Sequence, residues 1–239
     1  MPTEKLITGY REFREKFDSD HEVFERLAEE GQNPKVLWIG CCDSRVVPEL
    51  ITGADPGELF DLRNIANIVP PAPTRACATG AAIEYAVNHL EVTHIVVCGH
   101  TECGGIAALE SPPPAETEPH INSWLALAMP AREQVMAREV PADEVYLETI
   151  KTNVVLQCDN LRSYPCVAEG EKAGTLSVHS WLYDLHTGSI QAYDEASKTW
   201  AAVAEQSRGF QGHFDAAAIG WAPRVAGDGR RHDAESEHG

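Results

Sequence analysis

The hydrophobic positions of this chain follow two patterns, one typical of helices and one typical of strands. From Leu6 to Glu30 apolar residues recur every three or four positions, which predicts an N-terminal helix or a pair of helices. A Gly-Gln-Asn-Pro break at 31–34 follows. The apolar runs that come next are short and favour buried strands. We predict strands at 35–40, 57–62, 93–98, 175–183 and 189–193, the last two as a hairpin.

Helical spacing returns between these predicted strands, at 79–90, 121–138 and 143–161, and a further helix is predicted to open at Cys103. Strands that alternate with helices predict a single α/β domain, in which helices flank a mostly parallel sheet. We therefore expect an N-terminal helical arm at 1–30 and a catalytic α/β domain at 31–223. Residues 224–239 lack periodicity and are expected to be a disordered tail.

Composition and charge exclude several classes of protein. The 239 residues carry a formal net charge of −18, which disfavours a nucleic-acid partner because phosphate binding needs clustered Lys and Arg. No apolar run is long enough to cross a bilayer, and the N-terminus does not resemble a secretory signal. The seven cysteines are odd in number and scattered, so reduced thiols are expected. We expect a cytoplasmic protein with no membrane or nucleic-acid partner.

Cysteine and histidine residues that could bind a metal lie at or just after the ends of two predicted strands. Cys41 ends the first strand, and His100 and Cys103 follow the strand at 93–98. Ligands of open parallel sheets bind beyond the carboxyl ends of strands, so these side chains are expected to meet. Thiolate and imidazole are the ligands that zinc prefers, and a catalytic zinc site uses three protein ligands. Each residue alone is more often structural, but their joint placement predicts a metal site.

The sequence around these residues resembles that of the β-class carbonic anhydrases. Two paired motifs carry the resemblance, Cys-Cys-Asp-Ser-Arg at 41–45 and Gly-His-Thr-Glu-Cys-Gly-Gly at 99–105. It extends over roughly residues 30–195 and includes 56–60, 63–67, 80–87 and 180–184. The resemblance implies one Zn²⁺ per chain, bound by Cys41, His100 and Cys103. It also implies a lyase that hydrates CO2 to bicarbonate and a proton through zinc-bound hydroxide.

The resemblance further assigns catalytic roles to Asp43 and Arg45. Asp43 is expected to orient the nucleophile, while Arg45 holds Asp43 away from the metal. Two thiolates and a neutral imidazole leave the Zn²⁺ centre formally neutral and weaken it as a Lewis acid. Activity is therefore expected to favour alkaline conditions.

Two further groups of residues follow from the resemblance. The first is a substrate niche with Tyr85 contributed across a subunit interface, which makes the enzyme a homodimer or a larger oligomer such as a tetramer. The niche residues are Gln32, Phe60, Ile65, Tyr85 and Gly104. The second is a non-catalytic bicarbonate site of regulated bacterial enzymes, made of Trp38, Arg63 and Tyr183, whose donors suit an oxyanion.

Three alternatives stay open. A hydrolase of CS2 or COS would use the same zinc chemistry on a related linear molecule. A non-catalytic zinc protein would fill the fourth metal position permanently with Asp43, and a cysteine hydrolase would need a base beside an unmetallated thiol. The intact Asp43 and Arg45 argue against the non-catalytic zinc protein, the CO2-type motifs favour carbonic anhydrase over the CS2 or COS hydrolase, and His100 is better used as a zinc ligand than as a base.

Overall fold

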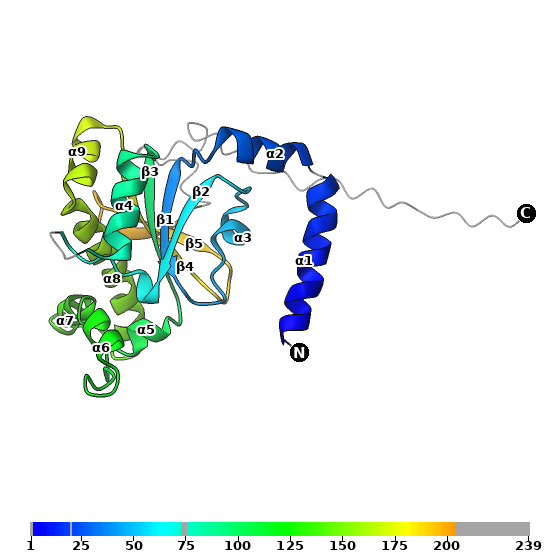
Figure 1. Ribbon diagram of the computed structural model, residues 1–239. Coiled ribbons are helices and arrows are strands. Elements are labelled where there is room, and N and C mark those ends of the chain that lie inside the picture. Colours follow the sequence, from blue (N-terminus) through cyan, green and yellow to red (C-terminus); the bar gives the residue numbers. More distant parts are fainter. Residues whose placement is uncertain (1, 20, 73–75, 204–239) are drawn as a thin grey trace, which may run out of the picture. The chain divides into compact units, whose positions relative to one another are not determined.

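The computed structural model describes residues 2–19, 21–72 and 76–203. The predicted tail at 224–239, like the end of the predicted catalytic domain, lies outside the described residues. A single six-stranded sheet organises the described part, with strand order β2-β1-β3-β4-β5-β6 (Figure 1). The strands are β1 Val36–Cys41, β2 Leu59–Asn64, β3 His94–His100, β4 Ser177–Tyr183, β5 Ile190–Asp194 and β6 Thr199–Ala202.

The first four strands are parallel, and β5 and β6 continue the sheet as antiparallel strands. The predicted fold class, a mostly parallel sheet flanked by helices, is therefore confirmed, and so is the hairpin of β4 and β5. The helices are α1 Pro2–Ser19, α2 His21–Glu30, α3 Pro48–Thr52, α4 Ala78–Asn88, α5 Gly104–Ala107, α6 Pro119–Leu125, α7 Met129–Met136, α8 Val145–Arg162 and α9 Pro165–Ala173, with a 3-10 turn at Ile65–Asn67. None of these described helices combines the length and apolar character needed to cross a bilayer.

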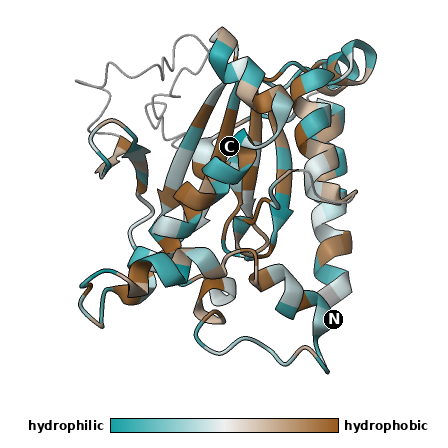
Figure 2. Cartoon of the chain, turned by 90° about the vertical axis from the view of Figure 1, so that its left-hand side faces the viewer, coloured by the Kyte–Doolittle hydropathy of each residue, from teal (hydrophilic) through white to brown (hydrophobic). Residues whose placement is uncertain are grey.

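One face of the sheet packs against helices and forms the main core. Leu37, Ile39, Ile95 and Val97 alternate along β1 and β3 and are fully buried with side chains of α4, α8 and α9. Figure 2 shows the hydrophobic residues running along the strands, while the helices also carry hydrophilic residues. The contact of α8 with the sheet is close, because a Cβ added at Gly99 would lie 2.5 Å from a methyl group of Val154. This packing positions the end of β3 firmly.

The helical stretch predicted at 121–138 is present but is divided into two helices. Residues 119–136 form two helices, and Pro130 lies in the first turn of the second. Proline has no N–H and its ring clashes with the preceding turn, so it is tolerated at a helix start but not in the interior. The short helices α3 and α9 and the strand β6 were not predicted.

Candidate metal centre

The three predicted ligands come together at the carboxyl ends of β1 and β3. Their donor atoms, Sγ of Cys41 and Cys103 and one ring nitrogen of His100, lie within 4.8 Å of one another. In the described part of the chain they are the one group of three or more His, Cys, Asp or Glu side chains close enough to share a metal ion. All three are buried, with at most 5% exposure. The structure thus brings together residues that are 62 positions apart.

The geometry of the cluster fits a zinc ion. Zinc–sulfur bonds of about 2.3 Å in tetrahedral array put two sulfurs about 3.8 Å apart. The Sγ atoms of Cys41 and Cys103 are 3.9 Å apart. Nδ1 of His100 contacts the carbonyl oxygen of Thr101 at 2.8 Å, so Nδ1 is the nitrogen that donates and Nε2 keeps its lone pair. That Nε2 is buried and has no hydrogen-bond partner among the described residues, as expected of a ligand atom.

The two thiols share a hydrogen bond, in which either sulfur can be the donor. The hydrogen bond from Cys103 lowers the pKa of Cys41 to about 4. The same hydrogen bond, together with burial, raises the pKa of Cys103. The lowered pKa of Cys41 favours a thiolate beside the lone-pair nitrogen of His100. A divalent cation suits this donor set, since it would stabilise the second thiolate as well.

The backbone around the ligands is shaped for their convergence. Glu102, between the two ligands of the second motif, has a φ of +57°, in the left-handed region that a non-glycine residue rarely adopts. Cys103 caps the start of α5, as predicted, although this helix is only one turn long. A Cβ at Gly105 would lie 3.0 Å from side-chain atoms of Ile65 and Ala66, so glycine allows this helix to approach the 3-10 turn.

Asp43 lies beside the ligands and is held by Arg45. Its carboxylate accepts hydrogen bonds from Nε of Arg45 at 2.9 Å, from Nη2 at 2.8 Å and from the Arg45 backbone N–H at 3.0 Å. These hydrogen bonds with Arg45 lower the pKa of Asp43 far below its usual range. Oδ2 of Asp43 is 3.9 Å from Nε2 of His100. Asp43 is therefore a carboxylate oriented by Arg45 next to the three predicted ligands.

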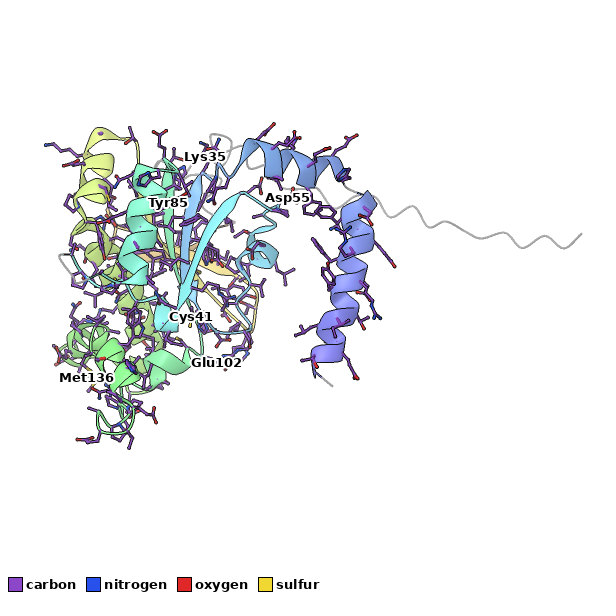
Figure 3. The ribbon with its side chains drawn as sticks, viewed as in Figure 1. Lys35, Cys41, Asp55, Tyr85, Glu102 and Met136 are labelled. Carbon is purple, nitrogen blue, oxygen red and sulfur yellow. The ribbon has the colours of Figure 1, made fainter. Side chains whose placement is uncertain are left out.

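The predicted substrate niche is divided between two ends of the sheet. Ile65 and Gly104 adjoin the cysteine–histidine cluster, and Ile65 is 41% exposed. The rings of Phe60 and Tyr85 contact each other, with centroids 5.9 Å apart, but lie at the other end. Phe60 is paired with Leu37, four positions before Cys41, which is about 13 Å along the strand. Figure 3 shows Tyr85 near Lys35 and far from Cys41 and Glu102.

Gln32 also belongs to the far end, because it precedes the first residue of β1. Within one chain, Gln32, Phe60 and Tyr85 therefore do not reach the metal ligands.

The residues of the predicted bicarbonate site share one face of the sheet. Trp38 and Gly40 are two positions apart on β1, so both lie on the face opposite the α4–α8 core. Arg63 of β2 is paired with Gly40 and therefore lies on that face as well. Tyr183 is paired with His100 and lies on the same face two strands away. No hydrogen bond joins Trp38, Arg63 and Tyr183 to one another among the described residues.

Three residues near the cluster were missed by the sequence reasoning. Glu102 contacts Arg45, and His186 in turn contacts Glu102. Tyr146 donates a hydrogen bond from its hydroxyl to the carbonyl oxygen of Cys103 at 2.9 Å. Glu102 could have been noticed because it stands between two ligands. His186 and Tyr146 have no signal in the sequence, since distant segments bring them to the site.

Comparison with known proteins places the chain among carbonic anhydrases. The sequence model of the carbonic anhydrase family matches residues 36–190. A carbonic anhydrase of Pseudomonas aeruginosa is 40% identical over 223 residues, which cover 92% of this chain and 98% of that protein. The solved β-carbonic anhydrase CcaA is 36% identical with a TM-score of 0.79, covering 84% of this chain and 91% of that chain.

A tetrameric β-carbonic anhydrase structure from Sordaria macrospora is 34% identical to this chain, with a TM-score of 0.69. The match covers 80% of this chain and 95% of that one.

Proposed function

The chain belongs to the β-class carbonic anhydrases, and we propose that it interconverts CO2 and bicarbonate with a zinc ion held by Cys41, His100 and Cys103. The observation that carries the proposal is the buried group of two thiols and an imidazole whose Nε2 has no protein partner. Zinc in such a group would lower the pKa of water toward about 7 in the best case and so supply a nucleophile near neutral pH.

Asp43 and Arg45 orient the reactants. Arg45 uses Nε, Nη2 and its backbone N–H on the Asp43 carboxylate, so that carboxylate stays ionised and can accept a hydrogen bond from the attacking water. Ile65 adds an apolar surface beside the ligands, which suits a linear molecule without charge. Hydration turns CO2 and water into bicarbonate and a proton, and the proton must leave to solvent in each turnover.

The state of Asp43 favours an enzyme over a non-catalytic zinc protein. A purely structural zinc site uses four protein ligands. Here three hydrogen bonds from Arg45 hold the Asp43 carboxylate, which is the nearest candidate for a fourth ligand. Ligation by Asp43 would have to compete with them.

A second copy of the chain completes the niche in this proposal. Tyr85 is 44% exposed and contacts Phe60 at the end of the sheet remote from the ligands. Two copies related by a two-fold axis can place the Tyr85 group of each chain over the ligand cluster of the other. The tetrameric relative supports an oligomer.

A bicarbonate site that regulates the enzyme is a second candidate function, favoured by Trp38. Nε1 of Trp38 is buried and has no hydrogen-bond partner among the described residues. The indole lies against Gly40, where a Cβ would be 2.6 Å from Nε1, so the position of the indole depends on that glycine. Arg63 donates to the carbonyl oxygens of Cys41 at 3.0 Å and Asp43 at 2.7 Å. An anion on Arg63 would therefore act on the backbone of the first motif, which couples the two sites.

Metal analysis with stopped-flow CO2 hydration tests the main proposal. We expect one zinc per chain and hydration that is lost when a chelator removes the metal and returns when zinc is restored. Turnover of CS2 or COS in place of CO2 would instead identify the hydrolase alternative. Stoichiometric zinc without turnover of any of the three would identify the non-catalytic alternative.

A further inference from the structure

An exposed network continues outward from the Asp43–Arg45 pair. Nη1 of Arg45 contacts Oε2 of Glu102 at 3.2 Å, and Nη2 contacts the Glu102 carbonyl oxygen at 3.2 Å. The other carboxylate oxygen of Glu102 contacts Nε2 of His186 at 2.8 Å. The four side chains therefore form a continuous line from the ligand cluster to solvent, with Glu102 and His186 at its outer end.

Glu102 does not compete with Asp43 for the same hydrogens. The two shortest contacts of the guanidinium, 2.9 Å from Nε and 2.8 Å from Nη2, go to Asp43. The Glu102 carboxylate takes Nη1, the nitrogen that Asp43 leaves unused. The second carboxylate thus fixes the plane of the guanidinium, which otherwise sits on a flexible side chain that is 50% exposed. An exposed ion pair by itself is weak, but a network with defined geometry is stronger.

His186 is itself anchored, because the turn between β4 and β5 is tied to the metal-binding segment. The backbone N–H of Leu185 donates to Oγ1 of Thr101 at 2.9 Å, and the N–H of Thr101 donates to the carbonyl oxygen of Tyr183 at 3.0 Å. The N–H of His186 donates to Oδ1 of Asp184 at 2.8 Å. The imidazole therefore approaches Glu102 from a fixed backbone.

We propose that Glu102, braced by His186, is a positioning residue that keeps the Arg45 guanidinium in the orientation required to hold Asp43. This inference rests on the proposed function, in which Arg45 and Asp43 orient the reactants. The network links the β4–β5 turn to the reaction site through His186, Glu102 and Arg45.

Two substitutions test this positioning role of Glu102 and His186 in the metal-loaded oligomer. Glu102→Gln removes the charge, and His186→Ala removes the outer contact. Each is expected to lower kcat about two- to fivefold, the size of effect for a partly exposed charge network, with KM unchanged. His186→Gln, whose amide can still donate to Glu102, is expected to restore most of the loss. Matched controls are Glu195→Gln, an exposed carboxylate that contacts Arg162 at the far end of α8, and His120→Ala on α6.

A second readout follows the guanidinium directly. The exchange of the Arg45 Nε–H with water, measured by nuclear magnetic resonance, is expected to accelerate severalfold in Glu102→Gln and His186→Ala and to stay unchanged in both controls. Unaltered exchange of the Arg45 Nε–H and unaltered kcat in these two variants would refute the positioning role of Glu102 and His186. A general loss of stability would instead accelerate exchange in many residues, and that outcome would equally contradict a specific positioning role.

Arg45→Ala separates this inference from the proposed function. If Arg45→Ala keeps near-normal turnover, the roles proposed for Arg45 and Asp43 are refuted. The positioning role of Glu102 and His186 is then refuted as well, because it acts through Arg45. If Arg45→Ala is strongly impaired while the Glu102 and His186 variants are normal, only the positioning role is refuted.

Discussion

The ligand cluster and the network beside it are close in space but differ in how they are stabilised. The three predicted ligands are at most 5% exposed, whereas the side chains of Arg45, Glu102 and His186 are 50%, 48% and 70% exposed. A buried thiol or imidazole that loses its partner stays unsatisfied, while solvent replaces the lost partner of an exposed group. Substitutions should therefore have all-or-none effects in the cluster and graded effects in the network.

The largest effect is expected from the ligands. Cys41→Ser, His100→Ala and Cys103→Ser should each lose most of the zinc and lower CO2 hydration by about 1,000-fold or more, because no other side chain supplies the nucleophile. Zinc content by plasma emission and hydration by stopped flow measure this. Cys158→Ala, which removes a buried thiol outside the cluster, is the matched control and should keep its zinc. Stoichiometric zinc in all three ligand variants would refute the assignment.

The second largest effect is expected from Asp43 and Arg45, which lie between the buried ligand cluster and the exposed network. Asp43→Ala and Arg45→Ala should retain zinc and lose about 10- to 100-fold in kcat, as residues that orient a metal site's reactants typically do. The same two measurements distinguish them from the ligand variants. Turnover close to that of the unmodified enzyme in both would mean that an oriented carboxylate is not needed beside the cluster.

A third prediction concerns the far end of the sheet. Tyr85→Ala should lower kcat/KM by about 10-fold, roughly the effect of one lost apolar or hydrogen-bonding contact to substrate. Mixing it with inactive His100→Ala provides the decisive measurement. In a mixed dimer, the ligands of the first chain meet the Tyr85 of the second, so activity should rise above that of the Tyr85→Ala enzyme alone. If the niche were built within one chain, no mixed site would be intact and no rise would occur.

The smallest expected effect is on regulation. Trp38→Phe keeps an aromatic ring but removes the buried N–H, so inhibition by bicarbonate should weaken about fivefold, the equivalent of one hydrogen bond. Turnover at alkaline pH should change little. Trp200→Phe is the control for the loss of an indole elsewhere in the sheet. Equal bicarbonate inhibition in Trp38→Phe and the unmodified enzyme, measured by initial rates against bicarbonate concentration, would argue against this site.

Local patterns were sufficient to predict most of the fold. Short apolar runs predicted five of the strands, since a buried parallel strand is apolar on both faces and is bounded by breaks. The edge strand β6 was missed, because a segment of four residues, of which only the first is exposed, carries little pattern. The sequence did not show that the helical stretch at 121–138 is divided into two helices. The apolar spacing continues across Pro130, whereas the missing N–H of proline interrupts the backbone hydrogen bonds and leaves the spacing unchanged.

The convergence of Cys41, His100 and Cys103 was predictable from sequence because these residues sit in two short motifs at strand ends. Their side chains had to converge once the strands were parallel neighbours, and the 3.9 Å separation of the two sulfurs agrees with that expectation. The pairing of Asp43 with Arg45 was predictable for the same reason, since two residues in one tight segment meet without help from the rest of the fold.

Contacts between distant segments were decided only by the tertiary structure. His186 reaches Glu102 because the β4–β5 turn is hydrogen-bonded to the segment after β3, and nothing in either segment alone encodes that distance. The division of the niche was equally invisible in the sequence, because Phe60 and Ile65 are five positions apart yet belong to opposite ends of a strand. A strand separates its two ends by about 3.3 Å per residue, so neighbours in the sequence can serve different sites.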